Sequence, residues 1–568
     1  MLGFRVGWVG FPTWQVAVET AQVVAGVVHY PVSTPFYVYH TKLWTILHQA
    51  LALGLQAGAS EVQLSLLVSG LLGMLSFQAL SLFVYALSRD AVLAIGSAFL
   101  IFFTQANEFG VNYPIHLLGS ADTYGVVGLS LCVLVAGLFG AGCSRTAAFL
   151  AGVAPAVHPS LGFWLILILT VCVAWDRKSL TERLHPAWKY FLAGCGVTAI
   201  SLLVQVAVIR DAPPVEATVA RTYLTAFVQL WDGHRRPVTI GAAGVMLNGW
   251  AVALALTWLT MFAADLPRSV VFLLRMVIVA GVLSFLLVLV SWIPPERLPP
   301  TLLILMPARL LNFNAMIASA LLLGLIGRYR RSFWSPFLLL LLSTGLLLGT
   351  RSMLWAWMGQ AIWISRIDAV LTIEVVSAGL VVLAAVGRSR REGAGPAFAA
   401  ATTAGRALLF GLLLLPAILT WRLATPPGLV FEDRLTDPLF KVAAQEQDGL
   451  LLTAANLHLM QLRTRRPVLV DGGGFDGLPY ALEAAPATDR VIRDVYGLDF
   501  FHPPAEARGT GMIPRGPNRV TWEGFSAEKW RSIRETYHVT QVLTWVDWTL
   551  RLPVTAQNRE LRLYSIPE

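Results

Sequence analysis

Charged residues are scarce in this chain of 568 residues. They make up 13% of it, whereas a typical soluble protein has about 25%. The mean hydropathy is +0.65, and apolar runs near the length that crosses a bilayer as a helix recur along the chain. These features exclude an ordinary soluble protein and predict a polytopic α-helical membrane protein.

Cysteine is also rare, because the chain has only four, all in or beside apolar runs and none in the C-terminal portion: Cys132, Cys143, Cys172 and Cys195. No CxxC pair occurs, which excludes a disulfide framework and a zinc site of that kind. No cleavable signal peptide is recognisable at the start. The net charge of +9 does not indicate nucleic-acid binding, because the basic residues of the first two-thirds lie mostly in short loops between apolar runs.

The apolar runs predict about 11 to 13 membrane spans. They lie at 62–87, 91–106, 124–143, 147–157, 160–175, 190–209, 239–263, 269–292, 307–327, 335–350, 368–387 and 406–421. Residues 1–18 are too short and too interrupted to span. Residues 41–57 are amphipathic, and we expect them to lie in the membrane interface.

Three basic loops, at 176–189, 327–332 and 388–391, orient the spans, because loops rich in Lys and Arg lie on the cytoplasmic side of the membrane. The segment 388–406 is then a cytoplasmic linker, and 351–367 an outer loop or re-entrant piece. The outer face receives 1–61, 107–123, the His158 turn, 210–238, 293–306, 351–367 and everything after about 422.

From about Phe431 the composition changes to that of a soluble domain. Runs at 451–455, 467–471, 540–546 and 561–567 predict strands, and 456–466 and 526–537 predict helices, the second with Ser526 as N-cap. This alternation predicts a small extracytoplasmic α/β domain with a largely parallel sheet. Three regions follow: 1–61, an outer loop with an acidic segment and an interfacial helix; 62–421, the multi-span domain; and 422–568, the α/β domain.

Glu19 is the first candidate functional residue. It lies in a polar and aromatic segment that cannot span, beside residues suited to sugar or headgroup contact: Gln22, His29, Tyr30, Tyr37, Tyr39 and His40. It could serve as a base or as a metal ligand next to the membrane. The alternative is a solvated acid on an amphipathic helix.

Further candidates fall on the same predicted face, although that face was assigned from the basic loops alone. The loop 107–123 holds Glu108, Tyr113 and Asp122, and an acid there could hold a divalent cation together with Glu19. Asp122 could instead cap the next helix. His158 is either a turn residue or a functional imidazole at membrane depth.

Cations also occur on this outer face, where positive charge is disfavoured. The segment WDGHRRP contains Asp232, His234, Arg235 and Arg236, and Arg309 begins a span. Arginine binds phosphate with two parallel hydrogen bonds, so an anionic lipid phosphate would explain these charges. A simple headgroup anchor is the alternative. The run VDGGGFDG lacks phosphate-loop spacing and is interpreted as a turn.

The chain resembles the GT-C superfamily of integral-membrane glycosyltransferases, in its poorly characterised bacterial branch. The features that carry the resemblance are the Glu19 segment, the loop with Glu108 and Asp122, WDGHRRP, Arg309 and the α/β tail opening with RRPVLVDGG. The oligosaccharyltransferase branch fits less well, because no WWD-type motif is present. Family members have a span before the acidic loop and usually a second acid. Here that span is missing or truncated, and Thr20 follows Glu19.

The resemblance implies transfer of a sugar from a polyprenyl-phosphate donor to a glycan, lipid or protein acceptor at the outer leaflet of the inner membrane. Glu19 would be the catalytic base, and Arg309 with His234–Arg236 would stabilise the leaving phosphate. Glu108, Tyr113, Asp122, His158 and Asp232 would help bind the substrate. Mg²⁺ or Mn²⁺ on Glu19 and Asp122 is the cofactor that the resemblance suggests. A non-catalytic lipid-binding component of envelope polysaccharide assembly or export is the alternative, and a transporter is disfavoured because its acids would lie near the midplane.

Overall fold

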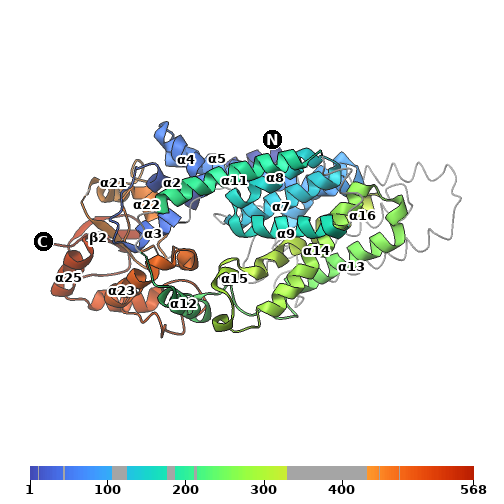
Figure 1. Cartoon of the computed structure of the whole chain (residues 1–568). Helices are drawn as coiled ribbons and strands as arrows, with labels where there is room; N and C mark the ends of the chain where they lie inside the picture. The colour runs from blue at the N-terminus through green and yellow to red at the C-terminus, as the bar shows by residue number, and fades with distance from the viewer. Residues whose placement is uncertain are drawn as a thin grey trace, which may run out of the picture.

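The computed structural model describes residues 1–10, 12–42, 45–104, 124–175, 186–209, 214–328, 431–446, 448–471 and 474–568. Within these ranges the chain forms a long bundle of apolar helices with a small α/β domain at one end (Figure 1). The predicted spans at 335–350, 368–387 and 406–421, the segment 351–367 and the linker 388–406 lie outside the described residues.

Every predicted span in the described part of the chain is a helix, and the helix ends lie within a few residues of the predicted ones. The helices are α5 (Glu61–Ser88), α6 (Ala91–Thr104), α7 (Tyr124–Ala141), α8 (Ser144–Val157), α9 (Pro159–Trp175), α11 (Trp188–Ile209), α13 (Ala243–Phe262), α14 (Arg268–Val290) and α16 (Leu311–Arg328). In the described ranges, five helical stretches are long and apolar enough to cross a membrane, and the 18-residue apolar window of the stretch that ends in α16 is wholly buried by its neighbours. The predicted fold class, a polytopic helical protein with a C-terminal α/β domain, is confirmed.

Short helices precede and interrupt the bundle. They are α1 (Leu2–Arg5), η1 (Val6–Gly10), α2 (Val16–Val24), α3 (Pro35–Lys42), α4 (Ile46–Gln56), α12 (Ala217–Ala226), η2 (Phe227–Trp231), η3 (Ala263–Asp265), η4 (Pro295–Arg297), α15 (Pro300–Ile304) and η5 (Pro307–Leu310). α1 and η1 lie against α5, where Gly3 and Gly7 pack directly on the backbone of the longer helix. α4 lies in the amphipathic stretch 41–57, whose interfacial position stays a prediction.

The C-terminal domain has four strands, β1 (Leu450–Thr453), β2 (Val539–Trp545), β3 (Val554–Gln557) and β4 (Leu561–Ser565), in the order β1-β2-β4-β3. Around them lie α21 (Pro438–Gln445), α22 (Met460–Thr464), η7 (Gly474–Tyr480), η8 (Leu482–Ala484), α23 (Ala485–Tyr496), α24 (Arg515–Gly524) and α25 (Ala527–Tyr537). Ser526 caps α25 by accepting from Lys529 N, as predicted.

The predicted largely parallel sheet is wrong, because only β1 and β2 are parallel and the other two pairs are antiparallel. β3 and β4 are joined by a hairpin, and no crossover helix separates β2 from them, so parallel pairing is out of reach.

The strand predicted at 467–471 is also absent, and only an isolated bridge joins Val468 to Leu451. At this bridge Leu451 N donates to Pro467 O and Leu469 N donates to Leu451 O, whereas the N–H of Val468 donates to the Tyr30 hydroxyl. The helix predicted at 456–466 shrinks to α22, because Asn456 and Leu459 have φ values of 63° and 58° that a right-handed helix cannot contain.

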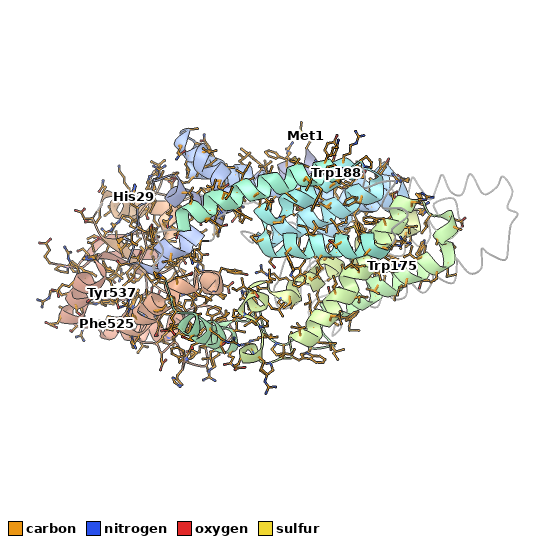
Figure 2. The ribbon with its side chains drawn as sticks, viewed as in Figure 1. Met1, His29, Trp175, Trp188, Phe525 and Tyr537 are labelled. Carbon is orange, nitrogen blue, oxygen red and sulfur yellow. The ribbon has the colours of Figure 1, made fainter. Side chains whose placement is uncertain are left out.

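Segments from three parts of the chain form the core of the C-terminal domain. Val28 and Phe36 from the N-terminal segment and Phe227 and Trp231 from η2 pack into the same hydrophobic cluster as the strands. In Figure 1, α2, α3 and α12 accordingly lie with the domain at one end of the bundle, and Figure 2 shows Trp175, at the end of α9, far from this domain. These segments of the predicted outer face therefore lie together, whereas residues 1–10, predicted for the same face, lie along the middle of α5.

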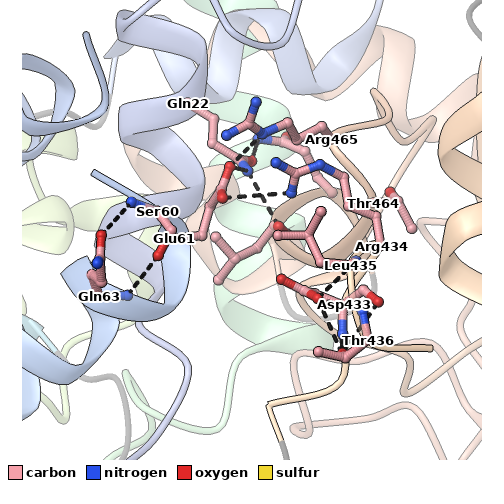
Figure 3. Close-up of polar contacts among 12 residues, drawn as sticks. Gln22, Ser60, Glu61, Gln63, Asp433, Arg434, Leu435, Thr436, Thr464 and Arg465 are labelled. Atoms are coloured by element: carbon pink, nitrogen blue, oxygen red, sulfur yellow. Dashed lines mark hydrogen bonds and ion pairs between the residues drawn. The ribbon is translucent and has the colours of Figure 1, made fainter. Parts of the chain in front are cut away.

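The junction between the bundle and the domain is centred on Glu61, the first residue of α5, which is only 1% exposed. Its carboxylate accepts from Arg465 Nε at 2.5 Å and from Gln22 Nε2 at 3.2 Å, and it lies 3.5 Å from Arg434 Nη1 (Figure 3). A buried carboxylate requires such partners, because removing one leaves an uncompensated charge.

Two buried asparagines hold three helices of the bundle together. Asn314 Nδ2 on α16 donates to Asn248 Oδ1 on α13 at 2.8 Å and to Val277 O on α14 at 3.0 Å. Asn248 Nδ2 donates to Gly281 O at 3.2 Å. Gly281 permits this approach, because a Cβ there would stand 2.1 Å from Val252 Cγ2 and 2.8 Å from Asn314 Nδ2.

We therefore expect Gly281→Ala to lower the thermal unfolding midpoint in detergent, with an overpacking cost of about 1–3 kcal/mol. Gly196→Ala is the matched control, because it places the same methyl group on α11 with no atom within 4 Å. An unchanged midpoint for Gly281→Ala would show that the three helices do not pack this closely.

Candidate functional site

Glu19 lies in the middle of α2, one face of which packs on the helix bundle. Val18 and Ala21 are fully buried in a cluster with α4 and α5. Gly26 lies just past the helix end with a φ of 72°, which glycine adopts without steric cost. Glu19 is 4% exposed. The solvated acid that the sequence left as an alternative is therefore wrong.

Aromatic residues of α3 lie close to Glu19. Burial raises the pKa of Tyr39, and the charges of Glu19 and Asp476 raise that pKa further. The ring also packs directly on Gly477, where a Cβ would stand 1.9 Å from a ring carbon. Only glycine permits this contact, which brings the Glu19 region and η7 together.

His40 lies beside Tyr39 and is buried. Its Nδ1 is 3.1 Å from the Thr20 hydroxyl, and burial lowers its pKa to about 3. His40 is therefore neutral at physiological pH. His40 makes a hydrogen bond to α2, and it does not supply a positive charge to an anionic ligand.

The WDGHRR loop is anchored by Trp231, whose ring is fully buried and donates to Phe500 O at 2.8 Å. Asp232 is also buried. It accepts from His234 N at 2.6 Å and forms an ion pair with Arg235. Arg235 Nε donates to Leu303 O at 2.9 Å, and its guanidinium lies 5.3 Å from the centroid of the Tyr480 ring. The Arg235 guanidinium is therefore buried and held by protein groups on two of its nitrogens.

Asp476 joins this loop to the C-terminal domain. Its carboxylate is 3.2 Å from His234 Nε2. Burial would raise the pKa of Asp476, but the hydrogen bond and charge of His234, with the charges of Arg235 and Arg309, lower it overall. Asp476 is thus an ionised carboxylate among the predicted phosphate-binding cations.

Arg309 and His158 also meet at this end of the bundle. Arg309 Nη1 lies 3.5 Å from His158 Nε2, and the neighbouring Ser160 hydroxyl donates to Leu305 O. Both predicted residues therefore belong to one cluster with Asp476, to whose pKa Arg309 contributes.

A pocket of about 370 Å³ opens beside the cluster. His234, Arg235 and Arg236 line one side of it, and the remaining wall is mainly apolar, from the end of α14 and from α15 and η5. Its largest apolar lining side chains are Trp292, Ile293, Leu298, Leu303 and Met306. Such a pocket suits an amphiphile with an anionic head.

Three ligand-type groups, from Asp232, His234 and Asp476, lie within 4.8 Å of one another. Two carboxylates and an imidazole could hold a divalent cation, but Asp232 already pairs with Arg235 and Asp476 with His234. A cation would replace these contacts. Asp122, which was predicted to bind a cation together with Glu19, lies outside the described residues. So do the predicted substrate-binding residues Glu108 and Tyr113.

The sequence reasoning missed four residues that shape the site. Asp476 belongs to a run interpreted as a turn, although an acid after a group of glycines was a signal, and Tyr480 follows that run. Glu61 begins an apolar helix and was passed over. Nothing in the sequence pointed to Gln461, whose side chain reaches the backbone of Glu19 at 2.8 Å.

Fold and site define a multi-pass helical membrane protein with a buried acid and a cationic pocket where the bundle meets a small α/β domain. No protein-family model and no curated protein matches the chain. Among solved structures it is similar to ArnT from Cupriavidus metallidurans bound to undecaprenyl phosphate, with 13% identity, 97% of each chain covered and a TM-score of 0.41. It is similar to the apo state of that protein as well, with 13% identity, 99% of this chain and 96% of the other covered, and a TM-score of 0.41.

A half-exposed histidine in the domain provides a pH test of this region. His458 Nδ1 is 3.1 Å from Asp471 Oδ1, and this hydrogen bond raises the pKa of His458 despite partial burial. Asp471 is buried, and its charge affects the pKa values of Tyr39 and His40.

A raised pKa in the folded state stabilises the protein below the ordinary histidine pKa of about 6.5, and this contribution is lost as the pH rises through the raised value. We therefore expect His458→Gln to lower the unfolding midpoint most at mildly acidic pH, and less as the pH increases. His502→Gln is the control, because the His502–Asp499 pair is exposed and exposed pairs contribute little. A difference in unfolding midpoint between His458→Gln and wild type that grows with pH would contradict a raised pKa of His458 in the folded state.

Proposed function

We propose that this protein is a membrane glycosyltransferase that moves a sugar from a polyprenyl-phosphate donor to an acceptor at the outer leaflet. The observation that carries this proposal is that a buried acid, Glu19, and a cationic and apolar pocket both lie where the bundle meets the α/β domain. α3 links the two regions: His40 lies 3.1 Å from Thr20 of α2, the Tyr39 ring packs on Gly477, and the neighbouring Asp476 is 3.2 Å from the pocket residue His234.

The chemistry follows from these positions. Glu19 takes the proton of an acceptor hydroxyl, and the hydroxyl oxygen forms a bond to the anomeric carbon of the donor sugar. The bond from that carbon to the phosphate oxygen breaks, and its electron pair leaves with the polyprenyl phosphate. A base must lie within hydrogen-bonding reach of the proton that it removes, which places the acceptor hydroxyl next to α2.

The leaving phosphate gains negative charge as the bond breaks, and fixed cations at that point stabilise the transition state. Arg235, Arg236 and Arg309 supply this charge, and the apolar wall of the pocket receives the first part of the lipid. Asp232 and Asp476 hold the cations in place. A divalent cation on Asp232, His234 and Asp476, or on Glu19 and Asp122, would add positive charge next to the phosphate.

Orientation is part of the proposal. The site lies at the outer face of the inner membrane, where the C-terminal domain is extracytoplasmic, and the acceptor is a glycan, a lipid or a protein. Thr20 favours a second candidate, a non-catalytic polyprenyl-lipid-binding component of envelope polysaccharide assembly or export. It stands where a second acid would be, and it bonds to neutral His40.

Replacement of Glu19 by Gln separates the two functions. We expect Glu19→Gln to abolish transfer from undecaprenyl-phosphate-linked hexoses to acceptors in a membrane extract, because the amide cannot accept the proton. Undecaprenyl phosphate should still bind. Glu528→Gln, on the surface of α25, is the control. Unchanged transfer by Glu19→Gln would refute the role of the base, and binding without transfer by the wild-type protein would favour the second candidate.

Arg309 provides the binding test. We expect Arg309→Gln to weaken binding of undecaprenyl phosphate in nanodiscs by about 10- to 100-fold, since a hydrogen bond to a charged group contributes about 1.5–3 kcal/mol. Arg275→Gln is the matched control. The Arg275 guanidinium lies 5.5 Å from the centroid of the Trp175 ring, which is far from the C-terminal domain (Figure 2). Equal affinities of the two variants would remove Arg309 from the phosphate site.

A further inference from the structure

Gln461, on α22 of the C-terminal domain, reaches the helix that carries the proposed base. Its Nε2 donates to the backbone oxygen of Glu19 at 2.8 Å and to Gln22 Oε1 at 3.2 Å. Its Oε1 accepts from the Tyr30 hydroxyl at 2.6 Å. Gln461 is fully buried, so both ends of the amide are satisfied by protein atoms alone.

These contacts form one hydrogen-bonded chain with a defined direction. At one end the Glu61 carboxylate can only accept, so the Gln22 amide nitrogen faces it, and the Gln22 oxygen faces Gln461. At the other end the N–H of Val468 can only donate, and it donates to the Tyr30 oxygen at 3.1 Å. The Tyr30 hydrogen then goes to the Gln461 oxygen, so the two ends of the chain fix both amide orientations.

α2 depends on such outside contacts more than a longer helix would. It has 9 residues, and no side chain caps its N-terminus, whereas isolated helices shorter than about 12–15 residues are marginal in water. Packing of Val18 and Ala21 holds one face of α2. Gln461 adds hydrogen bonds to the backbone of Glu19 and to the side chain of Gln22, and these restrain the rotation of α2 about its axis, which sets where the Glu19 carboxylate lies.

We propose that Gln461 is a positioning residue for the proposed base Glu19, so that the C-terminal domain is part of the transfer site. This inference rests on the proposed function for its consequence in catalysis, but its structural step can be measured separately. Gln461 does not touch the reacting atoms. It acts through the backbone of Glu19 and through Gln22.

Gln461→Leu removes the hydrogen bonds and keeps the approximate volume. We expect faster amide hydrogen exchange over residues 16–24, together with a kcat lowered by about 10- to 100-fold, as a displacement near 1 Å would cause. The KM for the undecaprenyl-phosphate-linked sugar should stay unchanged. Gln541→Leu is the matched control. Gln541, on β2 of the same domain, is also a buried glutamine, and it accepts a hydrogen bond from Arg466.

Gln461→Glu distinguishes positioning from general loss of stability. When protonated, a glutamic acid offers one O–H donor for the Glu19 oxygen and one acceptor for the Tyr30 hydroxyl, so it loses only the second donated bond, to Gln22, and burial favours this neutral form. The ratio of its kcat to that of wild type should therefore fall as the pH rises from about 5 to about 8. The Gln461→Leu ratio should not change with pH.

The outcomes separate the two proposals. Unchanged exchange over residues 16–24 in Gln461→Leu, or equally fast exchange in Gln541→Leu, would overturn the positioning role whatever the transfer assay shows. A pH-independent ratio for Gln461→Glu would also overturn it. Transfer that survives Glu19→Gln would refute the proposed function instead, while the exchange measurement would still decide whether Gln461 holds α2.

Discussion

The buried carboxylate of Glu61 is the constraint on which the site depends. It stands where α5 begins, and it needs partners because an unpaired buried charge is expensive. Arg434 and Arg465 of the C-terminal domain supply the opposite charge, and Gln22 of α2 supplies a further donor (Figure 3). One ionised group therefore joins the membrane bundle, the acid-bearing helix and the α/β domain, and it sets the direction of the hydrogen bonds that lead to Glu19.

The bundle was largely predictable from the sequence, because runs of apolar residues determine helices in a membrane whatever their neighbours are. The C-terminal domain was less so. The strands at 451–455, 540–546 and 561–567 were recognisable from their composition, but their relative directions depend on connection lengths. The false strand at 467–471 shows the limit, since its Val468 N–H bonds to Tyr30, a residue hundreds of positions away.

The candidate site was predictable where a residue was out of place for its surroundings. His158, Arg309 and the cations of WDGHRR were conspicuous because charge or imidazole at the face predicted to be the outer one needs a reason, and the structure brings Arg309 to 3.5 Å from His158. Asp476 and Gln461 belong to a segment with the composition of any soluble domain. Their importance lies in partners that only the folded chain supplies, so no local pattern could reveal them.

The hydrogen bond between Gln461 and Glu19 joins residues 442 positions apart, and this has a consequence for biogenesis. When α2 is synthesised, neither the glutamine that orients it nor the domain core that receives Val28 and Phe36 yet exists. All the spans must be inserted and the last domain folded before the acid is held in place. The candidate site is therefore complete only at the end of assembly, and a truncated chain would present an N-terminal segment with its apolar face uncovered.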